Sequence, residues 1–272
     1  MRLADIGVNL THRSFDRDRA EVVARAEAAG VSPLVITGTS VGASREAADY
    51  AGSFPALPGG ARRIYATAGV HPHDAKSCGS GTLAALRELA GRETVIAVGE
   101  CGLDYDRDFS PRPVQRLWFE KQIGLAAELG MPLFLHERGA FGDFAAMLKQ
   151  HAAGIGNFVV HCFTGSRREL ESYLSLGAYI GITGWFCDER RGARLWDLAG
   201  EIPAGRLLVE TDAPFLLPRD LPRGPGAGGG RSGRNEPRHL PHILRAIAAK
   251  AGKDAEQLAA ETFAATQKFF GI

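Results

Sequence analysis

Short apolar runs, rich in β-branched and aromatic residues, recur along the chain. Eight of them begin at Leu3, Leu34, Ile64, Val95, Leu133, Phe158, Ala178 and Leu207. The first four starts are separated by 31, 30 and 31 residues (34−3, 64−34 and 95−64), which fits a strand, a crossover helix and two loops. Apolar strands that alternate with helices predict a parallel sheet covered on both faces.

The segments between the runs carry helix signals. We expect Ser110 to cap a helix that has Pro111 as its first residue. Ser166 and Glu169 have the spacing of a capping box, and Asp254 is a suitable cap for the last helix. The main predicted helices cover residues 17–30, 110–130, 166–177, about 237–251 and about 254–270.

Eight strands with helices between them predict a (β/α)8 barrel of the TIM type, regular or distorted, with an additional C-terminal helix. The chain has 272 residues, close to the typical size of about 250 for such a barrel, so we expect one domain over 1–272. An open, doubly wound sheet is the alternative, because spacing does not show closure. No glycine-rich dinucleotide fingerprint follows the first run, which counts against a Rossmann domain.

Composition narrows the class of protein without naming a partner. The net charge is +1, so bulk charge indicates neither a nucleic-acid binder nor a membrane-surface protein. No signal-peptide region, membrane-length apolar run or sustained heptad pattern is present in the sequence. The four cysteines, Cys78, Cys101, Cys162 and Cys187, have irregular spacing, typical of a reduced compartment. We therefore expect a cytoplasmic monomer with no membrane association.

Side chains that ligate metals gather at the predicted C-terminal ends of the strands, where parallel barrels have their active sites. They are His71, His73, Glu100, His136, His161, Glu210 and Asp212. One such residue alone is usually a hydrogen-bonded rim residue, but so many at corresponding ends are hard to explain as independent accidents. Two imidazoles and two carboxylates suit a divalent cation. A cation also explains why a buried strand ends in acids.

The two cysteines beside this set are expected to point away from it. Side chains alternate along a strand, so Cys101 and Cys162 should face opposite to Glu100 and His161.

These residues favour metal-assisted hydrolysis. A bound cation lowers the pKa of water from about 15.7 to as low as about 7, and Asp212 is placed to orient that water or take its proton. His71 and Arg138 are candidates for holding an anionic group. Amide, lactone, phosphomonoester and phosphodiester bonds all remain open as substrates.

The local distribution of charge helps to choose among these substrates. Residues 219–238 contain five arginines, against Asp220 and Glu236. The segment follows the last strand, so we expect it over the same mouth, where arginine forks suit a phosphate backbone. A merely solvated loop is an equally good interpretation of its composition.

Seven motifs resemble those of the TatD deoxyribonucleases, in order and over nearly the whole chain. They are "DIGVNLT", "AGVHPHD", "GECGLD", "HCFTG", "GITGWFCDERRG", "ETDAP" with "FLLPRDL", and "GRNEPRHLPHI". The resemblance implies a TIM-barrel nuclease that uses a divalent metal, usually Mg²⁺. It also implies a 3′→5′ exonuclease that prefers single-stranded DNA and takes part in DNA repair.

The resemblance also assigns roles to residues. The implied metal ligands are Glu100, His136, His161 and Asp212, and the implied catalytic residues are Asp212 and His71. The substrate-binding candidates are His71, His73, Arg138, Arg234 and Asn235.

One motif departs from most of the wider family, which has a metal-binding His-x-His pair in the first strand. This chain has Gly7, Val8 and Asn9 there, so we expect one firmly held metal and at most a weak second one through Glu100. Histidine ligands also suit Mn²⁺ or Zn²⁺. Two rival functions remain: an amidohydrolase-like deacylase acting on aminoacyl-tRNA or a small molecule, and a non-catalytic barrel with a decayed metal site.

Overall fold

A computed structural model of the chain describes residues 1–203, 205–221 and 233–272. Eight parallel strands form one sheet in sequence order. They are β1 (Leu3–Val8), β2 (Val31–Ile36), β3 (Ile64–Ala68), β4 (Val95–Asp104), β5 (Leu133–Arg138), β6 (Phe158–Val160), β7 (Tyr179–Ile182) and β8 (Leu207–Val209). All eight predicted strands are confirmed, and β2 and β7 alone begin at residues other than the predicted ones.

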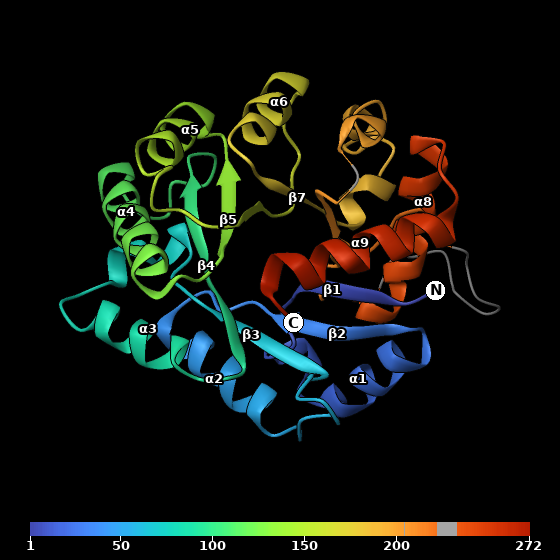
Figure 1. Cartoon of the computed structure of the whole chain (residues 1–272), viewed down its shortest axis with the longest axis horizontal. Coiled ribbons are helices and arrows are strands. Elements are labelled where there is room, and N and C mark those ends of the chain that lie inside the picture. Colours follow the sequence, from blue (N-terminus) through green and yellow to red (C-terminus); the bar gives the residue numbers. More distant parts are fainter. Residues whose placement is uncertain (204, 222–232) are drawn as a thin grey trace.

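Helices lie around the strands, except that α9 lies across one end of the barrel (Figure 1). They are α1 (Arg19–Ala28), α2 (Val41–Gly52), α3 (Thr82–Ala90), α4 (Arg112–Leu129), α5 (Phe141–Gln150), α6 (Arg167–Ser175), α7 (Ala193–Trp196), α8 (Leu240–Ala251) and α9 (Ala255–Phe270). The predicted TIM-type barrel is confirmed, and α9 is the expected additional C-terminal helix.

The crossover from β7 to β8 distorts the barrel. In place of a full helix it has two short 3-10 helices, Gly184–Cys187 and Ala199–Glu201, on either side of the four-residue α7. Gly184, Gly192, Gly200 and Pro203 interrupt this crossover, and these residue types disfavour a continuous helix.

The helix caps are mostly as predicted. Ser166 and Glu169 form the capping box of α6, and the Asp254 side chain caps α9. The prediction for Ser110 is wrong, because α4 begins at Arg112 with Pro111 as its cap. The Ser110 hydroxyl instead donates to the His73 carbonyl oxygen (2.8 Å), which ties the start of α4 to the segment after β3.

The barrel interior is filled by one apolar residue from each strand. These residues are Ile6, Val35, Tyr65, Ala97, Phe134, Val159, Tyr179 and Leu208. Phe269 of α9 packs edge-on against Tyr179, the first residue of β7, with ring centroids 5.0 Å apart. The N-terminal end of the barrel is therefore plugged by α9, and polar groups collect at the opposite end.

The seam between β8 and β1 is closed by a few specific hydrogen bonds. The Asp212 N–H donates to the Gly7 carbonyl oxygen (2.8 Å), and the Asn9 N–H donates to Ala213 (2.7 Å). Deeper in the seam, the buried Asp5 carboxylate accepts from both the N–H and the hydroxyl of Thr211. The Asp5 side chain thus takes the place of a backbone acceptor at this point of the seam.

Asp5→Asn is expected to remove a pH dependence of stability. Burial, opposed by the Thr211 hydrogen bonds, raises the pKa of Asp5 from 3.8 to about 8. Between those values the folded state keeps a proton that the unfolded state has lost. The free energy of unfolding should therefore fall by about 1.4 kcal/mol per pH unit from this group and level off above its folded pKa.

Asparagine keeps the acceptor oxygen and can donate to the Thr211 hydroxyl, so it preserves the seam without titrating. Urea unfolding between about pH 5 and about pH 9 should show the variant gaining stability relative to the natural chain as pH rises. Parallel curves for the two proteins would contradict the pKa assignment.

Candidate active site

A pocket of about 750 Å³ opens at the C-terminal ends of the strands. Its lining combines acids, imidazoles, arginines and aromatic residues. The lining includes Asn9, His71, His73, Glu100, Asp104, Arg107, His136, Arg138, His161, Cys162, Trp185, Asp212 and Phe215. The predicted strand-end residues therefore line one pocket, except Glu210, which is buried behind it.

Glu100 lies at the centre of three imidazoles. Its Oε1 is 2.8 Å from His161 Nε2, 2.9 Å from His136 Nδ1 and 3.3 Å from His71 Nε2. Burial by itself would raise the pKa of Glu100, but the positive charge of His161 and the hydrogen bonds from His136 and His161 hold it well below its usual range. Glu100 is therefore an ionised carboxylate in a buried position.

The imidazoles respond to the same carboxylate in different ways. Burial would lower the pKa of His161, yet the charges of Glu100 and Glu210 raise it well above its ordinary value. Burial likewise opposes protonation of His136, and hydrogen bonds to Asp104 and Glu100 raise its pKa. Burial prevails at His71, whose pKa is lowered. The positive charge of the protonated imidazoles offsets the negative charge of the carboxylates. A bound cation would provide the same compensation.

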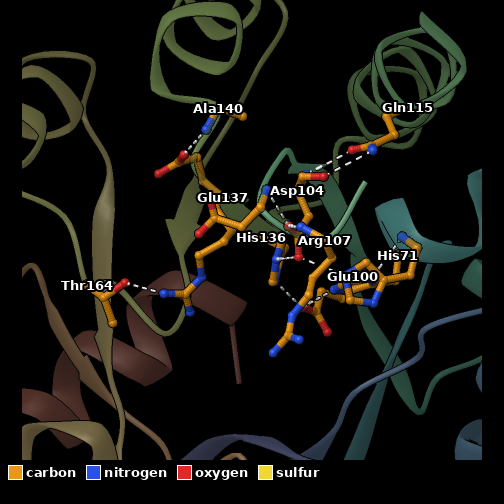
Figure 2. Close-up of polar contacts among 12 residues, drawn as sticks. His71, Glu100, Asp104, Arg107, Gln115, His136, Glu137, Ala140 and Thr164 are labelled. Carbon is orange, nitrogen blue, oxygen red and sulfur yellow. Dashed lines mark hydrogen bonds and ion pairs between the residues drawn. The ribbon is translucent and has the colours of Figure 1, made fainter. Parts of the chain in front are cut away.

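Asp104 is a second acid of the cluster, and the sequence reasoning missed it. Its Oδ2 lies 2.7 Å from His73 Nε2 and 3.3 Å from His136 Nε2. Gln115 of α4 holds the Asp104 backbone through both its N–H and its carbonyl oxygen (Figure 2). The spacing in the sequence could have identified Asp104. β4 continues to Asp104, and residues four apart, such as Glu100 and Asp104, lie on one face of a strand.

Asp212 enters the pocket from the segment after β8. Its φ is 54°, in the left-handed region that few residues other than glycine, asparagine and aspartate adopt. Asn9 Nδ2 donates to Asp212 Oδ1 at 3.0 Å. Burial, opposed by His161 and reinforced by the charges of Glu100 and Glu210, raises the pKa of Asp212 to about 7.

Glu210 is fully buried behind the cluster and orients His161. Its Oε2 is 3.2 Å from His161 Nδ1, and its Oε1 accepts from the Cys162 N–H at 2.6 Å. A Cβ built at Gly7 or Gly181 would run into the Glu210 carboxylate. Glu210 in its present position therefore leaves no room for a side chain at position 7. This explains why the first strand has a glycine where most of the wider family has the first histidine of the His-x-His pair.

The predicted substrate-binding residues separate into two groups. His71, His73 and Arg138 line the pocket, and Arg138 donates to Thr164 Oγ1 at 2.8 Å (Figure 2). Arg234 and Asn235 do not line it.

Arg234 and Asn235 instead hold the segment after β8 in place. The Arg234 guanidinium pairs with Asp18 and Glu236 and lies over the Phe15 ring. The buried Asn235 amide donates to the carbonyl oxygens of Thr211 (2.9 Å) and Leu216 (3.3 Å).

The arginine-rich segment is described only in part. Arg223 and Arg231 lie outside the described residues. Arg219 lies 3.6 Å from Asp188, and Arg238 lies 3.2 Å from Glu236. The expected arginine cover over the mouth is therefore not seen in the part of this segment that the structure describes.

The two cysteines behave differently. Cys101 faces the helices and belongs to the outer core, as expected from strand alternation. The prediction for Cys162 is wrong, because Cys162 lines the pocket. β6 ends at Val160 and Cys162 has a φ of 47°, so the two-residue alternation of a strand no longer applies there. The Cys162 Sγ lies 3.6 Å from the Thr183 hydroxyl.

The donor set of the pocket fits a divalent cation. Ligand atoms of His71, Glu100 and His136 lie within 4.8 Å of one another, and His161 contacts the same Glu100 oxygen. Glu210 takes His161 Nδ1, which leaves Nε2 as the ligating atom, the usual pairing of a metal-bound histidine with a carboxylate behind it. His71 differs, because its Nδ1 accepts from the His73 N–H (3.1 Å), so Nε2 of the neutral ring carries a hydrogen.

The fold and this cluster define a class: TIM-barrel hydrolases with a metal-binding pocket at the C-terminal ends of the strands. The profile of the family described as "TatD related DNase" matches residues 4–271, and the chain belongs to that family.

Known proteins are similar over the full length of the chain. It is 49% identical over 268 residues to a "3′-5′ ssDNA/RNA exonuclease TatD" of Klebsiella pneumoniae, covering 98% of this chain and 97% of that one. It is 48% identical to the Escherichia coli protein of the same name, covering 98% of both. The crystal structure of an E. coli TatD homologue, YJJV, superposes with a TM-score of 0.87 at 25% identity, covering 100% of this chain and 98% of that one.

Two expectations can be compared with these findings: the nucleic acid that is cleaved and the lack of a membrane span. The relatives' names include RNA as well as single-stranded DNA, whereas the sequence analysis named DNA alone. Among the described residues, no helix combines the length and apolar character needed to cross a membrane.

Proposed function

We propose that this protein is a metal-dependent 3′→5′ exonuclease that hydrolyses phosphodiester bonds of single-stranded DNA and RNA. The main support is the buried, ionised Glu100 surrounded by imidazoles at the floor of an open pocket. The names of relatives at 48–49% identity give the substrate and polarity. We further propose that it acts as a cytoplasmic monomer with a role in DNA repair, as the sequence analysis expects.

In this proposal the metal ligands are Glu100, His136, His161 and Asp212, and Asp104 supports the site through His136. When bound, the cation supplies Lewis acidity and makes water a better nucleophile near neutral pH. The imidazole ligands suit Mn²⁺ or Zn²⁺ as well as the Mg²⁺ that the family resemblance favours.

The protein's own groups handle the proton and the leaving oxygen. The Asp212 oxygen that accepts from Asn9 has a second lone pair for the cation, and the other oxygen takes a proton from the attacking water. A pKa of about 7 suits a group that must gain and lose a proton near neutral pH. His71 is a neutral ring whose Nε2–H faces Glu100 Oε1, 3.3 Å away, so this nitrogen donates rather than binds metal. In this proposal a bound substrate oxygen takes over that hydrogen bond.

Aromatic side chains around the mouth support a single-stranded substrate. Phe109 and Phe215 are 55% and 48% exposed, which is unusual for residues of this size. Phe109 packs edge-on against His73, and Phe215 against His12, with centroid distances of 4.7 and 5.4 Å. Trp185 lies under the Arg138 guanidinium, 5.1 Å from it. Exposed aromatic rings along a groove are the usual platform on which unpaired bases stack.

The test uses 5′-labelled single-stranded DNA and RNA with Mg²⁺, Mn²⁺, Zn²⁺ or a chelator. We expect a ladder that shortens from the 3′ end and is absent with chelator. The double variant Phe109→Ala/Phe215→Ala should raise KM for single strands by about 10-fold or more, because stacking contributes about 1–3 kcal/mol per base. Leu117→Ala, which alters a 47% exposed residue outside the pocket lining, is the control.

One outcome would contradict the nuclease proposal, and another would contradict only the role of the two exposed rings. Intact DNA and RNA with every metal would exclude the nuclease, and hydrolysis of aminoacyl-tRNA or of small amides would then identify a deacylase. An unchanged KM in the double variant would show that Phe109 and Phe215 are not stacking platforms, but it would not contradict the nuclease proposal.

A further inference from the structure

A second group of metal-ligating side chains lies outside the pocket. The Cys187 Sγ, a carboxylate oxygen of Asp220 and a ring nitrogen of His242 are within 4.8 Å of one another. They come from three separate segments: the 3-10 helix after β7, the loop after β8 and the first turn of α8. None of the three lines the pocket, so the nuclease mechanism makes no use of them.

Backbone packing holds these three segments together. The loop after β8 lies directly on Gly184, where an added Cβ would run into the Leu216 carbonyl oxygen and come within 3.3 Å of Pro218. Arg219 lies 3.6 Å from Asp188, the residue after Cys187. Cys187 and Asp220 therefore face each other across a close backbone contact, and the position of neither depends on a flexible surface loop alone.

The chemistry of the three donors selects the ion. A thiolate, an imidazole and a carboxylate are the ligands that Zn²⁺ takes in proteins, whereas Mg²⁺ avoids sulfur. The two negative ligands balance the charge of a divalent ion, which favours a partly buried site. Cys187 is 4% exposed, and the side chains of Asp220 and His242 are 49% and 27% exposed. Solvent therefore reaches the outer side of the group and can complete a fourth position.

We propose that Cys187, Asp220 and His242 bind a zinc ion that ties the loop after β8 to α8 and to the 3-10 helix after β7. The same loop begins beside Asp212 and carries Phe215 at the pocket rim. The ion thus fixes the loop that presents the catalytic acid, at a distance from the reaction itself. The proposal does not depend on the nuclease function.

The competing arrangement is a hydrogen-bonded trio without an ion. His242 Nε2 lies 2.7 Å from Asp220 Oδ1, which is a good hydrogen bond. Two ligand atoms about 2.0 Å from one tetrahedral zinc are about 3.3 Å apart, so zinc binding would separate this pair. An experiment must therefore detect the sulfur–metal bond itself rather than the stability of the loop.

Cobalt is the probe, because Co²⁺ replaces Zn²⁺ and a thiolate ligand gives it a charge-transfer absorption. We expect this band when the full chain, freed of metal, is titrated with Co²⁺. Cys187→Ser should abolish it. Cys78→Ser is the matched control, since Cys78 is half-buried and outside both sites, and Cys162→Ser controls for the cysteine in the pocket. Glu100→Ala should keep the band, which would show that the two sites are independent.

Zinc content gives a second readout. The purified natural chain should hold about one zinc more per molecule than Cys187→Ser or His242→Gln, and His242→Gln guards against a cysteine variant that fails to fold. A missing band in the natural chain, a band that survives Cys187→Ser, or equal zinc in all three proteins would each overturn the proposal in favour of the hydrogen-bonded trio.

Discussion

Asp212→Asn is expected to reduce exonuclease turnover by about 10²- to 10⁴-fold, the usual contribution of a positioned acid or base. Asparagine has the shape of aspartate and can still accept the hydrogen bond from Asn9 through its amide oxygen. It also tolerates the left-handed backbone at this position, where φ is 54°. The amide cannot take a proton from water, so kcat should fall while the fold is preserved.

The metal content of Asp212→Asn should stay close to that of the natural chain, because Glu100, His136 and His161 remain in place. Single-turnover assays and metal analysis on the same preparation check both expectations. Asp108→Asn is the matched control, since Asp108 has a φ of 48° but pairs with Arg112 on the surface. Full activity in Asp212→Asn, or equal losses in both variants, would remove Asp212 from the chemistry.

The strands could be predicted from the sequence because a strand buried on both faces is a continuous run of apolar residues. A parallel strand between two layers must be apolar throughout, and its polar residues can appear only where it ends. That is why His71, Glu100, His136, His161 and Asp212 could be predicted to meet without knowing their contacts. The barrel topology converts positions far apart in the sequence into neighbours around one mouth.

Two residues of the pocket were not predicted correctly, for different reasons. Asp104 was missed because the fourth strand was ended at Glu100, although the alternation that places Glu100 inward also places Asp104 inward. Cys162 was placed on the wrong side because its backbone leaves the strand conformation after β6. At Asp104 the strand is longer than predicted and alternation still holds, whereas at Cys162 the backbone conformation changes the direction of the side chain.

Arg234 and Asn235 show a different limit. Both stand in a motif of the family, and their residue types suit a phosphate backbone. Their partners, Asp18 and Thr211, are 216 and 24 residues away, so no spacing rule connects them. Asn235 contacts the segment after β8 that carries Asp212, Arg234 pairs with Asp18, and the role of both in substrate binding stays a prediction.

Glu100→Ala is expected to weaken binding of the catalytic metal by at least about 100-fold and to abolish activity with it. Glu100 is the carboxylate that contacts His71, His136 and His161 together, and even the residues that merely orient a ligand usually contribute 10- to 100-fold. Without it, the buried imidazoles lose the negative charge that offsets their own and repel a cation. Raising the metal concentration should restore little of the activity.

The two variants should differ in metal binding: Glu100→Ala should lose the metal, whereas Asp212→Asn should keep it. Calorimetric titration with Mg²⁺ and Mn²⁺ measures the loss, and circular dichroism shows that the barrel still folds. Glu137→Gln is the matched control: Glu137 lies next to His136, but its carboxylate accepts from the Ala140 N–H and the Tyr173 hydroxyl, away from the pocket. Normal metal affinity in Glu100→Ala would mean that the cation is held elsewhere in the pocket, with Asp104 and its two histidine contacts as the next site to alter.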